Sequence, residues 1–181
     1  VYFNDSGGSL LNKFQIKVTT GTNQSGTVIN DWIDVSTGIN SVSYTTNWSI
    51  PAAVFNLMQG GTNYVSVKVY DNAGNINIST DVFYVLKDTA SPSVPNMLSP
   101  VNGSTVNVTG VNFGWSSSAD SLSGVNGYDI EISTLSNFSV RYSSSYVTGT
   151  SQTFNLVSGY RYYWKVGSYD VAGNFSGFVS T

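Results

Sequence analysis

The chain has 181 residues, of which 40% are hydrophobic and only 9% are charged, and its formal net charge is −3. This hydrophobic content excludes a chain that is disordered by composition, and the sparse charge gives no electrostatic basis for binding nucleic acid. No stretch approaches the ~20 apolar residues of a membrane-spanning helix, so we expect no membrane insertion within this segment.

The first half of the chain predicts a series of short strands. Alternating or β-branched runs, separated by clusters of turn-forming residues, indicate strands at residues 1–3, 14–18, 28–35, 42–48, 64–70 and 82–86.

The spacing of apolar residues changes from a strand pattern to a helix pattern once, after residue 48. Ser49 can cap a helix and Pro51 suits the first helical turn, so we expect a short helix over residues 52–59 that ends at Gly60–Gly61. The helix would cross from one sheet to the other. The side chains expected to face inward are Val54, Leu57 and Met58.

Residues 88–95 predict a linker. Pro92 and Pro95 lack a backbone N–H and restrict the chain, so they favour a semi-rigid connection. We therefore expect one domain at residues 1–87 and a second at residues 96–181.

The second half predicts strands at residues 97–100, 106–115, 128–132, 138–147, 152–156, 159–170 and 175–181. A comparison of the two halves indicates that the first unit lacks its opening strand and that the second lacks most of its closing strand. Missing edges expose unpaired backbone, so we expect them to be filled by continuation of the parent chain or by strands from neighbouring copies.

A repeated motif, Tyr-Asp-x-Ala-Gly-Asn, relates the two halves. It predicts tight turns in which Asp accepts a local hydrogen bond, Gly takes positive φ and Asn tolerates the bend. The residues are Asp71, Gly74 and Asn75 in the first copy, and Asp170, Gly173 and Asn174 in the second. The copies lie 99 residues apart, the length of one β-sandwich domain, whereas Ile16 and Ile130 align at an offset of 114. The first unit thus has extra residues, which we assign to the helical crossover.

Several short motifs resemble those of tandem fibronectin type III-like and bacterial immunoglobulin-like domains. Trp115 lies where that family has a core tryptophan, residues 162–166 resemble its Tyr-x-aromatic-x-Val pattern with Tyr162 as the tyrosine corner, and residues 127–130 resemble its Gly-Tyr-x-Ile strand. The run 88–92 is similar to the junctions between such repeats. The first unit departs from the pattern, with Asn63 in the position of Tyr162. The resemblance implies an all-β fold of two tandem immunoglobulin-like sandwiches.

The residue types limit the chemistry available. Without His or Cys there is no Ser-His-Asp or Cys-His nucleophile and no His or Cys zinc site. The only close carboxylate pair is Asp129 and Glu131, which we expect on a solvent-facing strand surface. We therefore predict no catalytic residues and no enzymatic activity.

Calcium is the one cofactor for which the chain offers candidate ligands. Asp5, Asp88 and Asp120 carry oxygen atoms that suit a hard cation, and Asp88 lies at the expected domain junction. No closely spaced Asp-x-Asp-x-Asp loop is present, so turn or capping roles are the favoured interpretation of each Asp.

These features predict a structural or adhesive segment of a large extracellular or cell-surface bacterial protein, acting as a spacer or as an assembly module of a surface layer or filament. Its partners would be neighbouring domains of the same chain and like subunits. The alternative is a carbohydrate-binding or accessory module of a secreted polysaccharide-degrading enzyme, in which exposed aromatic rings bind glycans. The aromatic residues least tied to core positions are Trp32, Trp48, Tyr142 and Tyr146.

Overall fold

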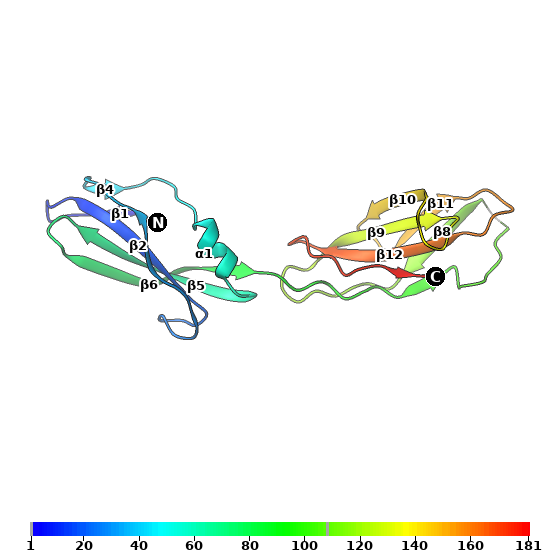
Figure 1. Cartoon of the computed structure of the whole chain (residues 1–181), viewed down its shortest axis with the longest axis horizontal. Coiled ribbons are helices and arrows are strands. Elements are labelled where there is room, and N and C mark those ends of the chain that lie inside the picture. Colours follow the sequence, from blue (N-terminus) through cyan, green and yellow to red (C-terminus); the bar gives the residue numbers. More distant parts are fainter. Residues whose placement is uncertain (1, 108) are drawn as a thin grey trace. The chain divides into compact units, whose positions relative to one another are not determined.

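The computed structural model describes residues 2–107 and 109–181 and divides the chain into two compact units, Val1–Lys87 and Asp88–Thr181. Each unit contains two antiparallel sheets (Figure 1), which confirms the predicted all-β class of two immunoglobulin-like sandwiches. No helix among the described residues is long and apolar enough to cross a bilayer.

Unit 1 has a large sheet and a small one. The large sheet has the order β3-β2-β5-β6, and the small sheet pairs β1 with β4. The element bounds are β1 (Phe3–Asn4), β2 (Leu11–Thr19), β3 (Val28–Ser36), β4 (Ser43–Tyr44), α1 (Ala52–Leu57), β5 (Gly61–Asp71) and β6 (Ile76–Lys87).

Unit 2 has a four-stranded sheet of order β10-β9-β12-β13 and a three-stranded sheet of order β11-β8-β7. Its small sheet therefore has one more strand than that of unit 1. The bounds are β7 (Met97–Ser99), β8 (Gly110–Trp115), β9 (Val125–Ser133), β10 (Arg141–Val147), β11 (Ser151–Asn155), β12 (Tyr163–Asp170) and β13 (Val179–Ser180).

Strand register shows that the two large sheets are equivalent. Ile16 of β2 lies opposite Val67 of β5, and Ile130 of β9 lies opposite Val166 of β12. All four side chains are buried, at 1% exposure or less. The offsets of 114 and 99 residues therefore hold across the paired strands and not only in the turn motif.

Alternation along the central strands builds both cores. Phe14, Ile16 and Val18 of β2 face inward in unit 1, and Tyr128, Ile130 and Ile132 of β9 do so in unit 2. Burying each such side chain stabilises the fold by about 1.5–3 kcal/mol. Phe14 and Tyr128 each meet further aromatic rings, so both cores are rich in ring contacts.

The crossover helix α1 differs from its prediction in two respects. It begins after Pro51 without any side-chain cap, so the expected cap by Ser49 is wrong. Val54 and Met58 are buried as predicted, but Leu57 is 60% exposed. The helix ends at Leu57 and Met58 already has extended backbone (ψ 142), so Met58 turns inward while Leu57 stays outside.

Two other segments also differ from expectation. The strand predicted at residues 42–48 shortens to β4, and Trp48 packs beside Phe14 and Phe83 outside any strand. Residues 88–95, predicted as a linker, pack into unit 2. Pro92 and Pro95 are buried there, and the Ser93 N–H donates to the Ala119 carbonyl at 2.9 Å.

Candidate functional site

The turn motif forms the same hydrogen-bonded corner in both units. In unit 2, the Asn174 N–H and side-chain amide donate to the two carboxylate oxygens of Asp170 at 2.8 and 2.7 Å. In unit 1, Asn75 does the same for Asp71 at 2.7 and 2.6 Å. The glycine of each corner has positive φ, +93° at Gly173. The structure thus places the turn residues where the sequence predicts them.

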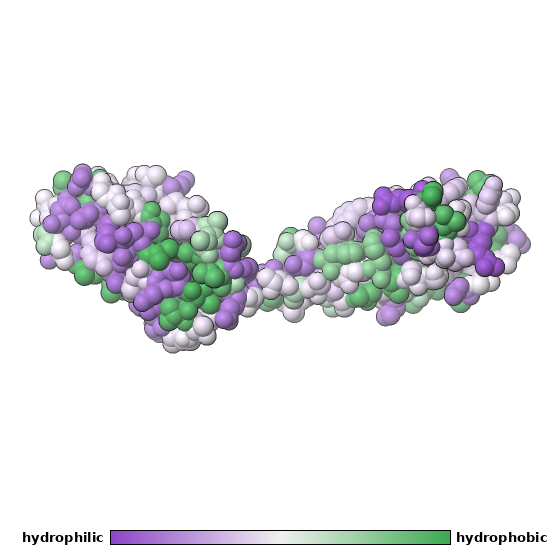
Figure 2. Space-filling model, in the orientation of Figure 1, coloured by the Kyte–Doolittle hydropathy of each residue, from purple (hydrophilic) through white to green (hydrophobic). Residues whose placement is uncertain are grey.

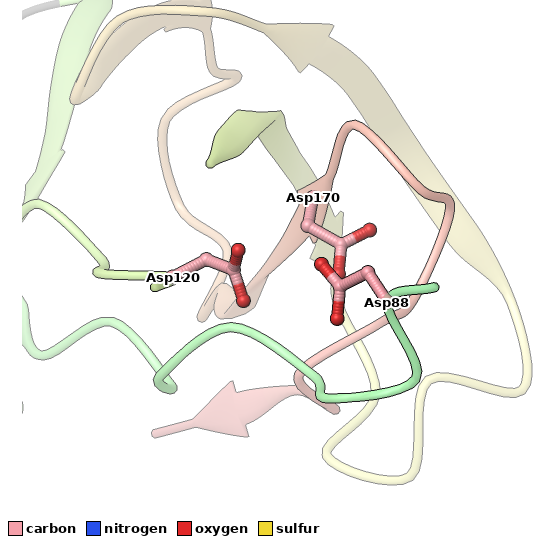
Figure 3. A group of neighbouring side chains, drawn as sticks. All are labelled: Asp88, Asp120 and Asp170. Atoms are coloured by element: carbon pink, nitrogen blue, oxygen red, sulfur yellow. The ribbon is translucent and has the colours of Figure 1, made fainter. Parts of the chain in front are cut away.

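Three aspartates meet beside the corner of unit 2. Asp88 precedes β7, Asp120 lies in the loop between β8 and β9, and Asp170 ends β12. Figure 3 shows the three side chains converging from these separate segments. One carboxylate oxygen from each lies within 4.8 Å of the others.

Backbone N–H groups hold each of these carboxylates in place. Asp120 Oδ1 accepts from the N–H groups of Leu122, Ser123 and Gly124 at 2.8–3.1 Å. Asp88 accepts from the Ala90 and Ser123 N–H groups at 2.9 and 3.1 Å. Ser123 therefore bridges Asp88 and Asp120, which fixes the spacing between the two carboxylates.

The negative charge of the group has no basic partner among the described residues. The ion pairs there connect Lys or Arg to other acids and leave out all three aspartates. Hydrogen bonding by Ser123 and by the Ala90 N–H lowers the pKa of Asp88, so this carboxylate is ionised at neutral pH. Asp170 is only 1% exposed.

This donor set suits a hard divalent cation. Ca²⁺ binds carboxylate oxygens at about 2.3–2.6 Å, so two of its ligands can lie up to about 5 Å apart. The observed spacing of 4.8 Å or less falls within that limit. The arrangement can therefore present three carboxylate oxygens to one ion.

Asp5, the other predicted calcium ligand, lies in unit 1 and does not join this group. It is the counterpart of Asp120: its oxygens accept from the Gly7 and Leu10 N–H groups at 2.7 and 2.6 Å. The Ser9 hydroxyl lies 3.2 Å from Asp5 and 2.8 Å from Asp71, so a neutral side chain separates the two acids. Unit 1 thus repeats the corner and loop, but no third carboxylate among its described residues joins Asp5 and Asp71.

Sequence reasoning missed Asp170 as a member of the group. It assigned Asp170 only to the turn, although Asp5 and Asp71 offered a usable signal, since they head the matching loop and turn of the first unit. The same repeat that identified the turns could have paired Asp120 with Asp170.

The carboxylate pair on β9 does not lie on a free solvent face as expected. Glu131 is 7% exposed and forms ion pairs with Arg141 at 2.7 Å and Lys165 at 2.9 Å. Lys165 in turn lies over the rings of Phe138 and Phe178. Burial, and then the charge of Glu131, raise the pKa of Asp129. The alternating pattern of β9 reveals neither the burial of Glu131 nor its two basic partners.

The aromatic residues considered for glycan binding are mostly engaged by neighbours. Lys68 Nζ lies 4.1 Å from the centre of the Trp32 ring, and Trp48 packs in the core of unit 1. Tyr142 and Tyr146 are 42% and 50% exposed. Their rings lie at 70° to Tyr162 and 52° to Tyr169, so neither pair forms a flat platform.

No family model matches the chain, and no curated protein matches its sequence. Among solved structures, it is similar to the fibronectin(III)-like modules of Clostridium thermocellum CbhA, with 13% identity and a TM-score of 0.45 over 99% of this chain and 82% of that one. It is also similar to the FN1–FN3 domains of chicken CNTN1, with 16% identity and a TM-score of 0.39 over 93% of this chain and 55% of that one. These neighbours are fibronectin type III-like modules. The strand order within each unit is that of an immunoglobulin-like or fibronectin type III-like β-sandwich.

Proposed function

We propose that the chain is a non-catalytic structural segment of a large extracellular protein, in which the two sandwiches act as a spacer or assembly module. The observation that carries this proposal is the repetition of the Asp71 corner at Asp170, hydrogen bond for hydrogen bond. What the two units share is thus a hydrogen-bonded turn that fixes a loop, which is an expected property of a structural repeat. Fold alone does not determine function, whereas these side chains serve the same structural role in both units.

The distribution of acidic groups supports the same proposal. Glu131 forms ion pairs with Arg141 and Lys165. The carboxylates of Asp5 and Asp71 accept hydrogen bonds from backbone N–H groups of their own loops. A carboxylate pair for glycoside hydrolysis needs one acid and one base open to substrate. Glu131 is 7% exposed and already paired with Arg141 and Lys165, which does not suit that chemistry.

A hydrolysis and binding screen on the whole 181-residue chain tests the proposal. We expect no turnover of a polysaccharide panel and no saturable binding to a glycan array. Turnover that disappears in Glu131→Gln would overturn the non-catalytic assignment. Glycan binding that disappears in Tyr146→Ala, but not in the control Tyr84→Ala on unit 1, would favour the carbohydrate-binding alternative, because both tyrosines are at least half exposed.

The three aspartates of unit 2 support a further part of this role. We propose that Asp88, Asp120 and Asp170 bind Ca²⁺ and that the ion ties together the start of unit 2, its first long loop and its corner. Three carboxylates without a basic partner repel one another, and a cation would convert that repulsion into attraction.

A further inference from the structure

The two large sheets carry different charges at equivalent positions of their outer faces, which are the faces turned away from the cores. On β2, the outward positions between the buried side chains hold Lys13, Gln15 and Lys17. At the offset of 114 residues, the same positions of β9 hold Gly127, Asp129 and Glu131. The central strand is therefore basic on its outer side in unit 1 and acidic there in unit 2.

Strand register extends this contrast to the neighbouring strand of each sheet. Gln15 lies opposite Lys68 of β5, and Asp129 lies opposite Gly167 of β12. Gln15 matches Asp129 at the offset of 114 residues, and Lys68 matches Gly167 at the offset of 99. The same pair of facing positions thus presents a cation in unit 1 and an anion in unit 2.

Lys68 and Asp129 lack an ion-pair partner among residues 2–107 and 109–181, where the ion pairs involve other side chains. Both side chains are half-buried. The Lys68 ammonium lies 4.1 Å from the centre of the Trp32 ring, a contact that keeps it against the sheet face. Burial, and then the charge of Glu131, raise the pKa of Asp129, so an approaching cation would relieve an unfavourable charge there.

An accessible apolar side chain stands beside each of these two charges. Ile78 of β6 lies opposite Lys68 and is 47% exposed, and Tyr146 of β10 lies opposite Asp129 and is 50% exposed. Covering such side chains with a second surface removes apolar area from water. It also lowers the local dielectric constant, which strengthens the attraction between opposite charges.

We propose that the outer face of the large sheet of unit 1 binds the outer face of the large sheet of unit 2 in a second copy of this chain, with Lys68 of one copy paired to Asp129 of the other. Charge complementarity selects this occupant. Two copies of the unit 1 face would bring Lys68 against Lys68, and two copies of the unit 2 face would bring Asp129 against Asp129, and both arrangements are repulsive.

The contact joins two different surfaces, so each copy can bind a neighbour through each of its units. The two sheets pack face to face, as the layers of a sandwich do. This inference names the partner for the assembly role proposed above and rests on that role.

Analytical ultracentrifugation of the intact chain tests the proposal. We expect the average mass to rise between about 10 μM and 1 mM protein at about 20 mM salt, and the association to weaken as added salt screens the pair. Lys68→Glu and Asp129→Lys should each weaken self-association at least about tenfold, because each brings like charges together. An equimolar mixture of the two variants should restore association, because their altered faces are complementary.

Two further variants separate the contact from folding and from net charge. Asp129→Asn keeps the shape of the side chain and should weaken association about threefold. Arg161→Glu makes the same change of charge as Lys68→Glu at an exposed position outside both sheets, and it should associate within about twofold of the unsubstituted chain. Thermal unfolding first checks that each variant is folded.

Several results would overturn the inference. A chain that stays monomeric at about 1 mM protein and low salt would do so, while leaving the spacer role to the separate hydrolysis and glycan screen. Association that is unchanged in both Lys68→Glu and Asp129→Asn would show that these residues do not meet, even if Asp129→Lys does not fold. A mixture of folded Lys68→Glu and Asp129→Lys chains that does not associate would show the same. An equal loss in Arg161→Glu would assign the effect to net charge.

Discussion

Asn63 in unit 1 and Tyr162 in unit 2 occupy equivalent positions and fix the same bend with different side chains. The Tyr162 hydroxyl bonds both the N–H and the carbonyl of Val157, at 3.1 and 3.2 Å. The Asn63 amide accepts from the Gln59 N–H at 3.2 Å and donates to the Gln59 carbonyl at 2.9 Å. What looks in the sequence like a departure from the tyrosine corner is therefore a substitute for it.

Replacing the buried amide of Asn63 should destabilise unit 1 selectively. Asn63 is fully buried, and Asn63→Ala leaves the Gln59 and Gly61 carbonyls without this donor, which costs about 1–3 kcal/mol of unfolding free energy. Chemical denaturation followed by NMR, which reports each unit separately, measures the change. Asn56→Ala on the exposed face of α1 is the control and should change stability by less than about 0.5 kcal/mol. Equal losses in the two variants would contradict the assigned role.

Two aspartates should respond to substitution with opposite signs. The pKa of Asp129 is raised by burial and by Glu131, so its charge opposes folding at neutral pH. Asp129→Asn should therefore raise the Tm of unit 2 at pH 7, and the gain should shrink as falling pH protonates Asp129 in the original chain. Hydrogen bonds from Lys13 and Gln15 lower the pKa of Asp34.

Because these hydrogen bonds stabilise the ionised Asp34 carboxylate in the folded state, Asp34→Asn in unit 1 should lower the Tm at pH 7. The loss should be present above the unfolded pKa of about 3.8 and vanish as the pH falls through the lowered folded pKa. Thermal unfolding of both variants between about pH 2 and pH 7 measures the two effects. A loss of stability in Asp129→Asn at pH 7 would show that its carboxylate makes a favourable contact.

Calcium should stabilise unit 2 and leave unit 1 unchanged. Adding CaCl₂ after treatment with a chelator should raise the Tm of unit 2 by several degrees, because an ion that binds only the folded state shifts the equilibrium toward it. Asp120→Asn removes the charge but keeps an oxygen for the loop N–H groups, and it should abolish the response. Asp5→Asn, the equivalent change in unit 1, is the matched control. A response that survives in Asp120→Asn would place the ion elsewhere.

Lys87 should stabilise the C-terminus of α1. Its ammonium group donates to the carbonyls of Phe55, Asn56 and Met58 at 2.9–3.2 Å, and only the Phe55 carbonyl also accepts a backbone N–H, that of Met58. Lys87→Met should destabilise unit 1 by about 1 kcal/mol in denaturant titrations. Lys17→Met serves as the control, because its ion pair with Asp31, whose side chain is 73% exposed, contributes less than about 0.5 kcal/mol. An effect no larger than that of the control would mean that solvent satisfies these carbonyls.

The sequence predicts the fold well where one face of a strand is buried. In β2 and β9 every second side chain is apolar and buried, because a shift of one residue would turn these side chains out of the core, and the repeat offsets follow from the same constraint. The prediction fails for residues 42–48, which have strand-forming side chains but keep a partner strand only at β4. β-propensity describes a fit to a half-buried surface, and such a surface must exist for the strand to form.

The site could be predicted only in part. The residue types alone indicate Asp88 and Asp120, whereas only the repeat points to Asp170, because its contact with them depends on the folding of β12 against both loops. Burial of Glu131 was missed for a similar reason. The side chains that pair with it come from Arg141 and Lys165, which lie outside β9.

The two buried prolines at residues 92 and 95 determine where a folded fragment of unit 2 can begin. A recombinant fragment that starts at Asn96 would discard them together with Ser93, and it would expose Ser168 to water. A fragment that starts at Asp88 keeps Ser93 and both prolines, and it should be the shortest fragment of unit 2 that is expressed in soluble form. Limited digestion of the intact polypeptide should spare the peptide bonds near Pro92, although their composition resembles that of a protease-sensitive tether.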